Sequence, residues 1–475
     1  MSATAYSVRR HTYLDSVFLM RVAKALEERP GVTGVAALMA TPANKEMLRD
    51  AGFSGAEVDR AAPDDLVVGV TAPTAEEAQI ALSGLDALLA TDLSVQTNQL
   101  VRTWDQAVAQ LPLADLAVIS IPGEYAASEV EHALNYGLHV FCFSSNVSLA
   151  DEIRLKQLAE SRGLLLMGPD CGTSIIAGTG IGFSNAVRRG PIGIAGGSGT
   201  GIQAISCLVH GAGSGVSHAI GTGSRDVSDE VGGVSTFAAL RALSDDPGTE
   251  VIVLVFKAPG VTTLGRLNEF AATCVKPVVT CFLGGAGAGS ALTLEEAASQ
   301  ALRLVSCGPG PNGAGSQEPP HIEGRALGLF AGGSFLLEAQ GILQRAGVQP
   351  DRYQLVDMGS EELTRGRPHP MIDSRLRAER IAQAGDDAAI GALLLDFVLG
   401  RGAALDPVGD LVPSIKVAQS RPARAGRELL VVASLCGTDE DPQDRAAQEA
   451  KLRDAGVVLF PTSTRAAGFL AGALR

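Results

Sequence analysis

The chain contains 475 residues, 46% of them hydrophobic and 19% charged, with a net charge of −14 at pH 7. This length suits about three domains, and the hydrophobic content excludes a disordered protein. The acidic balance leaves no basic stripe to neutralise a phosphate backbone, so we expect no nucleic-acid partner.

The N-terminal segment, MSATAYSVRRHTYLDSV, lacks the apolar core of a secretory signal, and the chain contains no run of about 18 apolar residues. The seven cysteines show neither a CxxC pair nor zinc-ligand spacing, and most stand in apolar runs such as VVTCFLGG. We therefore expect a cytoplasmic protein that makes no membrane contact, forms no disulfide and carries no metal site.

Residues 1–110 are predicted to form a small N-terminal α/β domain, in which SVFLMRVAKALEERPG has helical periodicity and VTGVAALMA and DDLVVGVTA have strand character. Between 111 and 187, apolar strands (DLAVISIP, LHVFCFSS, LLLMGPDCG) alternate with helices (GEYAASEVEHALNYG, DEIRLKQLAESRG). Continuous apolar strands separated by helices indicate a parallel sheet covered on both faces. Two further α/β blocks, 188–307 and 323–475, flank a Gly- and Pro-rich linker at 308–322.

These last two blocks are copies of one unit. The first opens PIGIAGGSGTGIQAIS and the second RALGLFAGGSFLLEAQGIL, with AGGS beginning at Ala195 and Ala331. A Gly-Ser tetrapeptide follows 26 residues later in each copy, beginning at Gly221 and Asp357. Two apolar strands come next in each copy, VIVLVFKAPG and KPVVTCFLGG in the first, GALLLDFVLG and ELLVVASLCG in the second. This order predicts a duplicated domain.

The repeated unit has the form of an anion site. A strand runs through Gly-Gly-Ser directly into a helix, which leaves the first-turn N–H groups unpaired at the positive end of the helix dipole. Two such helices, related by approximate two-fold symmetry, could aim their N-termini at one phosphate. The residues predicted to contact it are Gly196, Gly197, Ser198, Gly199, Thr200, Gly332, Gly333 and Ser334. The alternative is that the glycines only allow the helix to pack closely on the strand.

Other nucleotide sites fit less well. Residues 197–201 spell G-x-G-x-G rather than the dinucleotide pattern G-x-G-x-x-G, and the second copy lacks even this. Asp226, which could bind a ribose, lies in a Gly/Ser loop beyond a strand end. The chain contains no Walker A sequence.

Three segments resemble parts of succinyl-CoA synthetase. ADLAVISIPGEYAASEVEHALNYGLHVFCFSS with LLLMGPDCG resembles the later half of its CoA-binding domain, and GPIGIAGGSGTGIQAIS with IGTGSRD resembles its α-subunit ligase domain. RALGLFAGGSFLLEAQGIL with LVDMGS resembles the C-terminal domain of its β-subunit. The fusion of these parts, with GRPHPMID at 366–373, looks like the FdrA family. The resemblance implies an α/β fold in which a Rossmann-like CoA-binding-type domain precedes two flavodoxin-like, succinyl-CoA synthetase-like domains.

In that superfamily two helices hold a phosphate that a phosphohistidine carries, and the helices near Ser198 and Ser334 would be those helices. The segment that matches the phosphohistidine loop, GGAGAGS at 284–290, contains no histidine, and Lys257 stands where the family has a glutamate. The ATP-grasp domain and the first Gly-rich CoA loop have no counterpart. The resemblance therefore implies a site that binds an acyl phosphate without a phosphohistidine.

FdrA proteins are associated with oxamate carbamoyltransfer in allantoin breakdown, so the resemblance implies a carbamoyltransferase subunit. The reaction interconverts carbamoyl phosphate plus oxamate with oxalurate plus phosphate. The expected partners are the other subunits of that complex, in a homo- or hetero-oligomer, together with a small acyl phosphate and a carboxylate. An acyl-CoA synthetase subunit and a non-catalytic scaffold subunit are the alternatives.

Three side chains are predicted to be catalytic. Lys257 follows a strand end and could neutralise a phosphate or carboxylate, unless it is a solvated loop residue. Arg367 and His369 lie in GRPHPMID, where prolines fix the backbone around the histidine. Together they could hold a carboxylate and polarise a carbonyl, unless the histidine is simply buried and bonded within its loop. Carbamoyl phosphate or phosphate is the predicted ligand, whereas CoA and Mg²⁺ stay open because no motif supports either.

Overall fold

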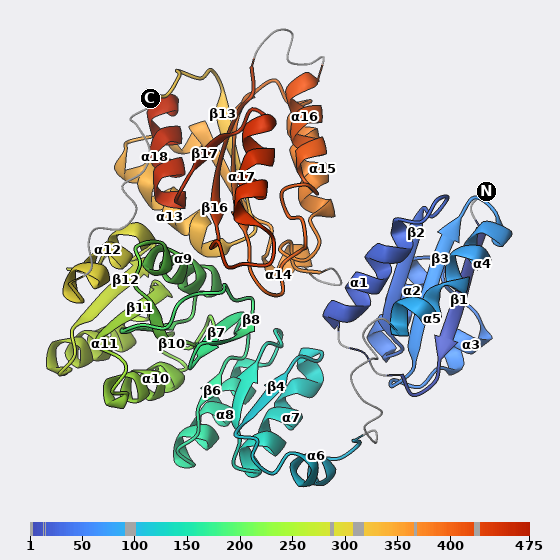
Figure 1. Ribbon diagram of the computed structural model, residues 1–475, viewed down its shortest axis with the longest axis horizontal. Coiled ribbons are helices and arrows are strands. Elements are labelled where there is room, and N and C mark those ends of the chain that lie inside the picture. Colours follow the sequence, from blue (N-terminus) through green and yellow to red (C-terminus); the bar gives the residue numbers. More distant parts are fainter. Residues whose placement is uncertain are drawn as a thin grey trace. The chain divides into compact units, whose positions relative to one another are not determined.

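The computed structural model describes residues 3–12, 14, 16–90, 101–285, 289–306, 318–364, 368–421 and 428–475. The chain divides into two compact units, Met1–Pro112 and Leu113–Arg475 (Figure 1). Most of the predicted linker at 308–322 lies outside the described residues. No helix among those described is long and apolar enough to cross a membrane.

The first unit is an antiparallel sheet with helices. Its strand order is β1–β3–β2, and its elements are β1 (Ala3–Arg9), α1 (Ser16–Glu27), β2 (Gly34–Met39), α2 (Pro42–Asp50), α3 (Ala56–Arg60), β3 (Leu66–Ala72), α4 (Ala75–Ser83), α5 (Leu85–Ala90) and α6 (Trp104–Gln110). Alternate residues of the central strand, Leu66, Val68 and Val70, share a core with Leu19 and Leu26 of α1. The predicted helix and two strands of this domain are α1, β2 and β3.

The second unit begins with a short parallel sheet in the order β4–β5–β6. Its elements are β4 (Leu116–Ile119), α7 (Gly123–Asn135), β5 (His139–Cys142), α8 (Leu149–Ser161) and β6 (Leu166–Met167). These are the strands and helices that the sequence predicts between 111 and 187. Three strands make up only half of a doubly wound dinucleotide-binding sheet, which has six.

A β-hairpin that the sequence does not reveal comes next in the chain. β7 (Thr173–Ile176) and β8 (Thr179–Gly182) pair antiparallel. Ala177 and Gly178 at the turn have φ values of 50° and 87°, as in a type I′ turn, which favours Asn-Gly or Asp-Gly. Ala-Gly is a weaker signal, so TSIIAGTGIG does not stand out as a hairpin.

The first repeat is a six-stranded sheet in the order β12–β11–β9–β10–β7–β8. Its further elements are β9 (Ile192–Gly196), α9 (Gly199–Gly211), β10 (Val216–Gly221), α10 (Val234–Asp245), β11 (Val251–Lys257), α11 (Val261–Thr273), β12 (Val278–Leu283) and α12 (Leu294–Leu304). Strands β9 to β12 are parallel. Every residue of β11 before Lys257 is buried, as expected for a strand covered on both faces.

The second repeat has the strand order β14–β13–β15–β16–β17. Its elements are β13 (Arg325–Phe330), α13 (Gly333–Arg345), η1 (Pro350–Arg352), β14 (Tyr353–Asp357), α14 (Glu361–Thr364), α15 (Arg375–Ala384), β15 (Ile390–Val398), α16 (Val412–Ser420), β16 (Leu430–Cys436), α17 (Arg445–Asp454), β17 (Val458–Phe460) and α18 (Ser463–Leu474). The order β14–β13–β15–β16 matches β10–β9–β11–β12 strand for strand. The internal repeat of the sequence is therefore also a repeat of topology.

The two repeats pack on each other through α9 and α13, and Arg465 of α18 forms an ion pair with Glu295 of α12 (Figure 1). Ile202 and Ile205 of α9 belong to the same buried core as Phe335 of α13. The Cβ that Gly332 lacks would lie 2.7 Å from Cγ2 of Thr200, so a side chain there would push the repeats apart.

Replacing Gly332 by alanine should destabilise the second unit by about 1–3 kcal/mol, because the added methyl group overpacks the contact with Thr200. Gly468→Ala is a matched control, since nothing within 4 Å meets the Cβ that this exposed glycine of α18 lacks. Alanine at 468 should be neutral or stabilise by up to about 1 kcal/mol. Urea denaturation measures both free energies of unfolding, and equal effects would contradict the close packing of the repeats.

Candidate functional site

Two helix N-termini meet between the repeats. Ser198 caps α9, and its Oγ accepts a hydrogen bond from the N–H of Gly201 at 2.9 Å. Ser334, in the first turn of α13, forms a hydrogen bond with Ser198 through the two Oγ atoms. Both serines are 3% exposed. The structure thus brings together the two Gly-Gly-Ser turns that the sequence proposes for a shared site.

The first turns of these helices present open backbone N–H groups. Those of Gly199, Thr200, Gly333 and Ser334 come too early in their helices to find an intrahelical acceptor, and no acceptor is recorded for them among the described residues. Gly199 and Gly333 are partly exposed, so a small ligand can reach these two positions. The positive ends of two helix dipoles meet here and favour an anion.

The glycines just before α9 have a packing role. The Cβ that Gly196 lacks would lie 2.6 Å from the carbonyl oxygen of Val255, and that of Gly197 would lie 2.6 Å from the carbonyl oxygen of Gly223. Neither position has room for a side chain, which supports the close-packing alternative for these two residues. The first-turn amides of α9 are those of Gly199 and Thr200.

A buried acid closes part of the second turn. Asp396 of β15 is 1% exposed, and its carboxylate accepts hydrogen bonds from the N–H groups of Ala331 and Gly332, both at 2.8 Å. Arg377 donates to the same carboxylate at 2.7 Å. The N–H of Gly332 is thus held by the protein and is not open to phosphate, which corrects the prediction for this residue. The strand register places Val253 at the equivalent position of the first repeat, so the first turn lacks such an acid.

Thr173 of the unpredicted hairpin adds a polar group to the site. It is 1% exposed, and its Oγ1 has no hydrogen-bond partner among the described residues. This oxygen lies 3.1 Å from the point where a Cβ on Gly199 would stand, at the start of α9. A buried hydroxyl without a partner is costly, and a ligand oxygen at the helix end would satisfy it.

Lys257 and Asp357 stand at the start of α13. Lys257 ends β11 and is exposed, and its Nζ lies 3.7 Å from the point where a Cβ on Gly333 would stand. Oδ2 of Asp357, at the end of β14, lies 2.5 Å from the same point. Burial raises the pKa of Asp357, and this outweighs the opposite effects of its hydrogen bond from Gly359 N and of nearby Lys257. Its only signal in the sequence is its place at the head of the repeated Gly-Ser tetrapeptide.

His369 and Asp357 both lie close to Gly359. The Cβ that Gly359 lacks would be 2.7 Å from Nε2 of His369 and 3.3 Å from Oδ1 of Asp357. Burial lowers the pKa of His369 to about 4, so its imidazole is neutral at pH 7. Its Nδ1 accepts a hydrogen bond from Met371 N at 3.3 Å, which leaves the proton on Nε2. Arg367 lies outside the described residues, so its role beside His369 stays a prediction.

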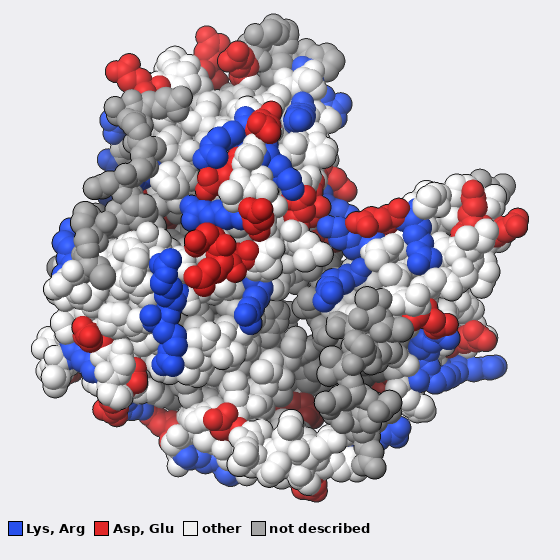
Figure 2. Space-filling model, in the orientation of Figure 1, with Lys and Arg blue, Asp and Glu red and all other residues white. Residues whose placement is uncertain are grey.

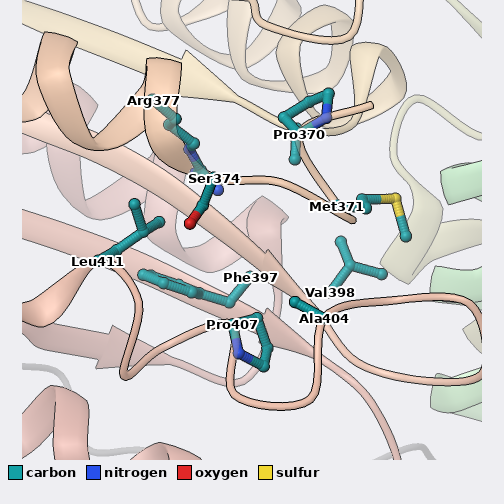
Figure 3. Close-up of a pocket in the computed structure, with 10 residues that line it drawn as sticks. Pro370, Met371, Ser374, Arg377, Phe397, Val398, Ala404, Pro407 and Leu411 are labelled. Carbon is teal, nitrogen blue, oxygen red and sulfur yellow. The ribbon is translucent and has the colours of Figure 1, made fainter. Parts of the chain in front are cut away.

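Neither described cavity contains the two serines. The smaller is lined by Ala331, Pro370, Met371, Ser374, Arg377, Phe397, Val398, Ala404, Pro407 and Leu411 (Figure 3). Its volume of about 10 Å³ suits one water molecule. The larger, about 250 Å³, is lined by Met358, Leu363, Pro368, Pro370, Asp373, Arg375, Leu376 and Glu379. The open amides therefore face neither cavity, and an anion would bind at the helix ends themselves.

Asp226 has a structural role that excludes a ribose contact. It is fully buried and accepts hydrogen bonds from Lys156 Nζ at 2.6 Å and from Thr236 N at 2.7 Å. The side chain of Lys156 is also fully buried and pairs with Glu152 at 2.9 Å. The ion pair of Lys156 with Asp226 joins α8 to the start of α10, so the carboxylate of Asp226 is not available to a ligand.

The charged surface is mixed. On the face shown in Figure 2, the described Lys and Arg side chains lie among Asp and Glu side chains, and no stripe of one sign crosses it. Mixed charge is typical of an ordinary solvated surface.

Comparison with known proteins gives matches over both units. The family described as "AllF, heavy metal-associated domain" matches residues 1–103, and the family described as "CoA-ligase" matches residues 329–471. The uncharacterized protein YahF of Escherichia coli is 37% identical in an alignment that covers 96% of each chain. The α-subunit of succinate–CoA ligase (ADP-forming) from Staphylococcus aureus is 28% identical over 177 residues, 36% of this chain and 57% of that subunit.

Among solved structures, the apo form of the dinucleotide-forming acetyl-coenzyme A synthetase 1 of Ca. Korarchaeum cryptofilum matches with 16% identity and a TM-score of 0.34. The match covers 76% of this chain and 82% of that one.

The parallel sheets and the CoA-ligase match place the chain in the succinyl-CoA synthetase-like superfamily. Within it, the chain belongs to the family of YahF.

The superfamily and the first matched family imply CoA and a heavy metal, and the residues present fit neither well. Among the described residues, the β4–β5–β6 sheet has no further strand whose Gly-rich turn would hold a pyrophosphate in a doubly wound fold. The first unit contains no cysteine, the ligand that soft metals prefer. Its candidate metal ligands among the described residues are His11, Asp64 and Asp65, and the Asp65 carboxylate already accepts from Arg10, His11 N and Ala62 N.

His369 should make the protein less stable as the pH falls from 6.5 to 4. The unfolded chain takes up a proton near pH 6.5, whereas the folded chain does so only near its pKa of about 4, so folding is penalised below pH 6.5. The full effect is up to about 3.5 kcal/mol at 1.4 kcal/mol per pKa unit. Urea denaturation at pH 5 and pH 7 should show that His369→Gln reduces this dependence, while His132→Gln, at an exposed site on α7, keeps it. A pH dependence that survives in His369→Gln would show that the imidazole is not held neutral.

Proposed function

We propose that this protein is a subunit of a carbamoyltransferase of the FdrA family. It binds carbamoyl phosphate, transfers the carbamoyl group to oxamate and releases phosphate. The observation that carries the proposal is the meeting of α9 and α13 at Ser198 and Ser334, with open first-turn amides beside it. The unpartnered hydroxyl of Thr173 supports a ligand oxygen at the same place. The loop at 284–290 contains no histidine, so the phosphoryl group is not transferred to a histidine of this loop.

The same residues suit the charge that carbamoyl transfer develops. As the C–O bond to phosphate breaks, negative charge grows on the phosphate, and the amides of Gly199 and Gly333 can stabilise it without moving. Lys257 adds a positive charge beside Gly333. The neutral His369 can donate its Nε2 proton in a hydrogen bond to a carbonyl oxygen of the acceptor.

A second candidate is an acyl-CoA synthetase subunit, which the CoA-ligase match over residues 329–471 favours. This candidate requires a partner that supplies ATP and a histidine, because the chain has neither an ATP-grasp domain nor a histidine at 284–290. Incubation with carbamoyl phosphate and oxamate should release phosphate if the transferase proposal holds. Formation of a CoA thioester in the presence of ATP, CoA and a carboxylate would favour the synthetase. Full activity of the partner subunits alone would indicate a scaffold.

Lys257→Glu should weaken the binding of carbamoyl phosphate by about 10- to 150-fold. A charge-assisted contact is worth about 1.5–3 kcal/mol, and each 1.4 kcal/mol is about a factor of ten in affinity. Calorimetric titration measures the change, with circular dichroism as the control for folding. Lys416→Glu, which reverses an exposed charge on α16, should leave the affinity unchanged. Lys257 would be a solvated loop residue if its variant bound within a factor of about two of the wild type.

A further inference from the structure

Asp357 places a carboxyl group in a site that favours an anion, so anion binding alone does not explain its presence there. Its Oδ1 accepts a hydrogen bond from Gly359 N at 2.9 Å, whereas Oδ2 has no recorded hydrogen bond to any described residue. Oδ2 is also the oxygen that lies against Gly333, one of the partly exposed open amides of α13. One oxygen is therefore fixed by the backbone, and the other faces the place where a ligand would bind.

The charges around Asp357 favour a carboxylate that can gain and lose a proton. Lys257, from β11, lowers its pKa, and Asp396, from β15, raises it. His369 is neutral at pH 7 and adds no charge. Burial is the largest effect and raises the pKa, so the acid is poised above its ordinary range.

We propose that Asp357 is the proton acceptor of this site and that the acceptor substrate is an N–H nucleophile. The inference rests on the proposed function. When the amide nitrogen of oxamate attacks the carbonyl carbon of carbamoyl phosphate, a C–N bond forms and the C–O bond to phosphate breaks. Phosphate leaves with the electron pair of that bond, and the nitrogen gives one proton to Oδ2 of Asp357, which returns it to solvent.

A base is needed in any step whose nucleophile carries a proton. The carboxylate that a carboxylate–CoA synthetase activates has no proton to lose when it attacks phosphate, although the CoA thiol that attacks in the next step must lose one. A neutral amide must lose a proton as it attacks, and general base catalysis of such a step is worth about 10²- to 10⁴-fold. An acid held with one oxygen free beside the open amides is thus suited to an amide or amine acceptor.

The test compares the full-length wild type with Asp357→Asn, which keeps the shape of the side chain. Phosphate is titrated in two buffers of different ionisation enthalpy, which reports the protons taken up on binding. The wild type should take up protons, because a phosphate dianion beside Asp357 raises its pKa. Asp357→Asn should bind phosphate about tenfold more tightly, the equivalent of one pKa unit, without this uptake. Asp351→Asn, at an exposed position of the same repeat, should behave as the wild type.

Phosphate release from carbamoyl phosphate plus oxamate gives the second readout. It should fall at least 100-fold in Asp357→Asn, and the loss of rate at low pH that we expect for the wild type should disappear. If the wild type binds no phosphate, the proposed function itself fails. If phosphate binds but the Asn variant keeps the proton uptake or the rate, the anion site stands and Asp357 is not its base.

Discussion

The second unit depends on bringing two helix N-termini into contact. Each helix start carries a partial positive charge, so their approach is unfavourable unless negative charge or hydrogen-bond acceptors lie close by. The hydroxyl groups of Ser198 and Ser334 form a hydrogen bond with each other at the contact. Gly332, which has no side chain, leaves room for Thr200. Asp396 and Asp357 supply negative charge at the start of α13. An additional anion bound at the amides that remain open would reduce the same repulsion between the two helix N-termini.

The two copies of the repeat have diverged in what they place at this contact. In the second copy Asp396 takes up two backbone amides and is itself held by Arg377. In the first copy the equivalent strand position is Val253, and the amides of Gly199 and Thr200 stay open. A duplicated fold has thus given one turn whose preceding amides are held by a buried acid and one turn without such an acid, while the first-turn amides of both helices stay open.

Buried charges connect segments that are far apart in the chain. Lys156 and Asp226 join the short parallel sheet to the first repeat, and Glu338 accepts hydrogen bonds from Leu294 of α12 and Thr464 of α18. Each of these groups has partners of opposite charge or polar donors, which a buried charge needs to be tolerated. Because an apolar contact can shift along a helix more easily than a directed polar contact, these contacts restrict how the segments that they join can dock.

The sequence by itself determined the local elements and the duplication, because continuous apolar strands, helical periodicity and Gly-Gly-Ser turns are properties of short segments. It therefore predicted the strands β4 to β6 with their helices, the matching of the two repeats and the pairing of the turns at Ser198 and Ser334, but not the hairpin of β7 and β8. It did not reveal that Thr173, Asp357 and Asp396 converge on those turns, since the three lie in separate segments and none stands in a recognisable motif. Only the tertiary structure decided which amides are free, because a backbone N–H is open or closed according to what a distant strand places against it.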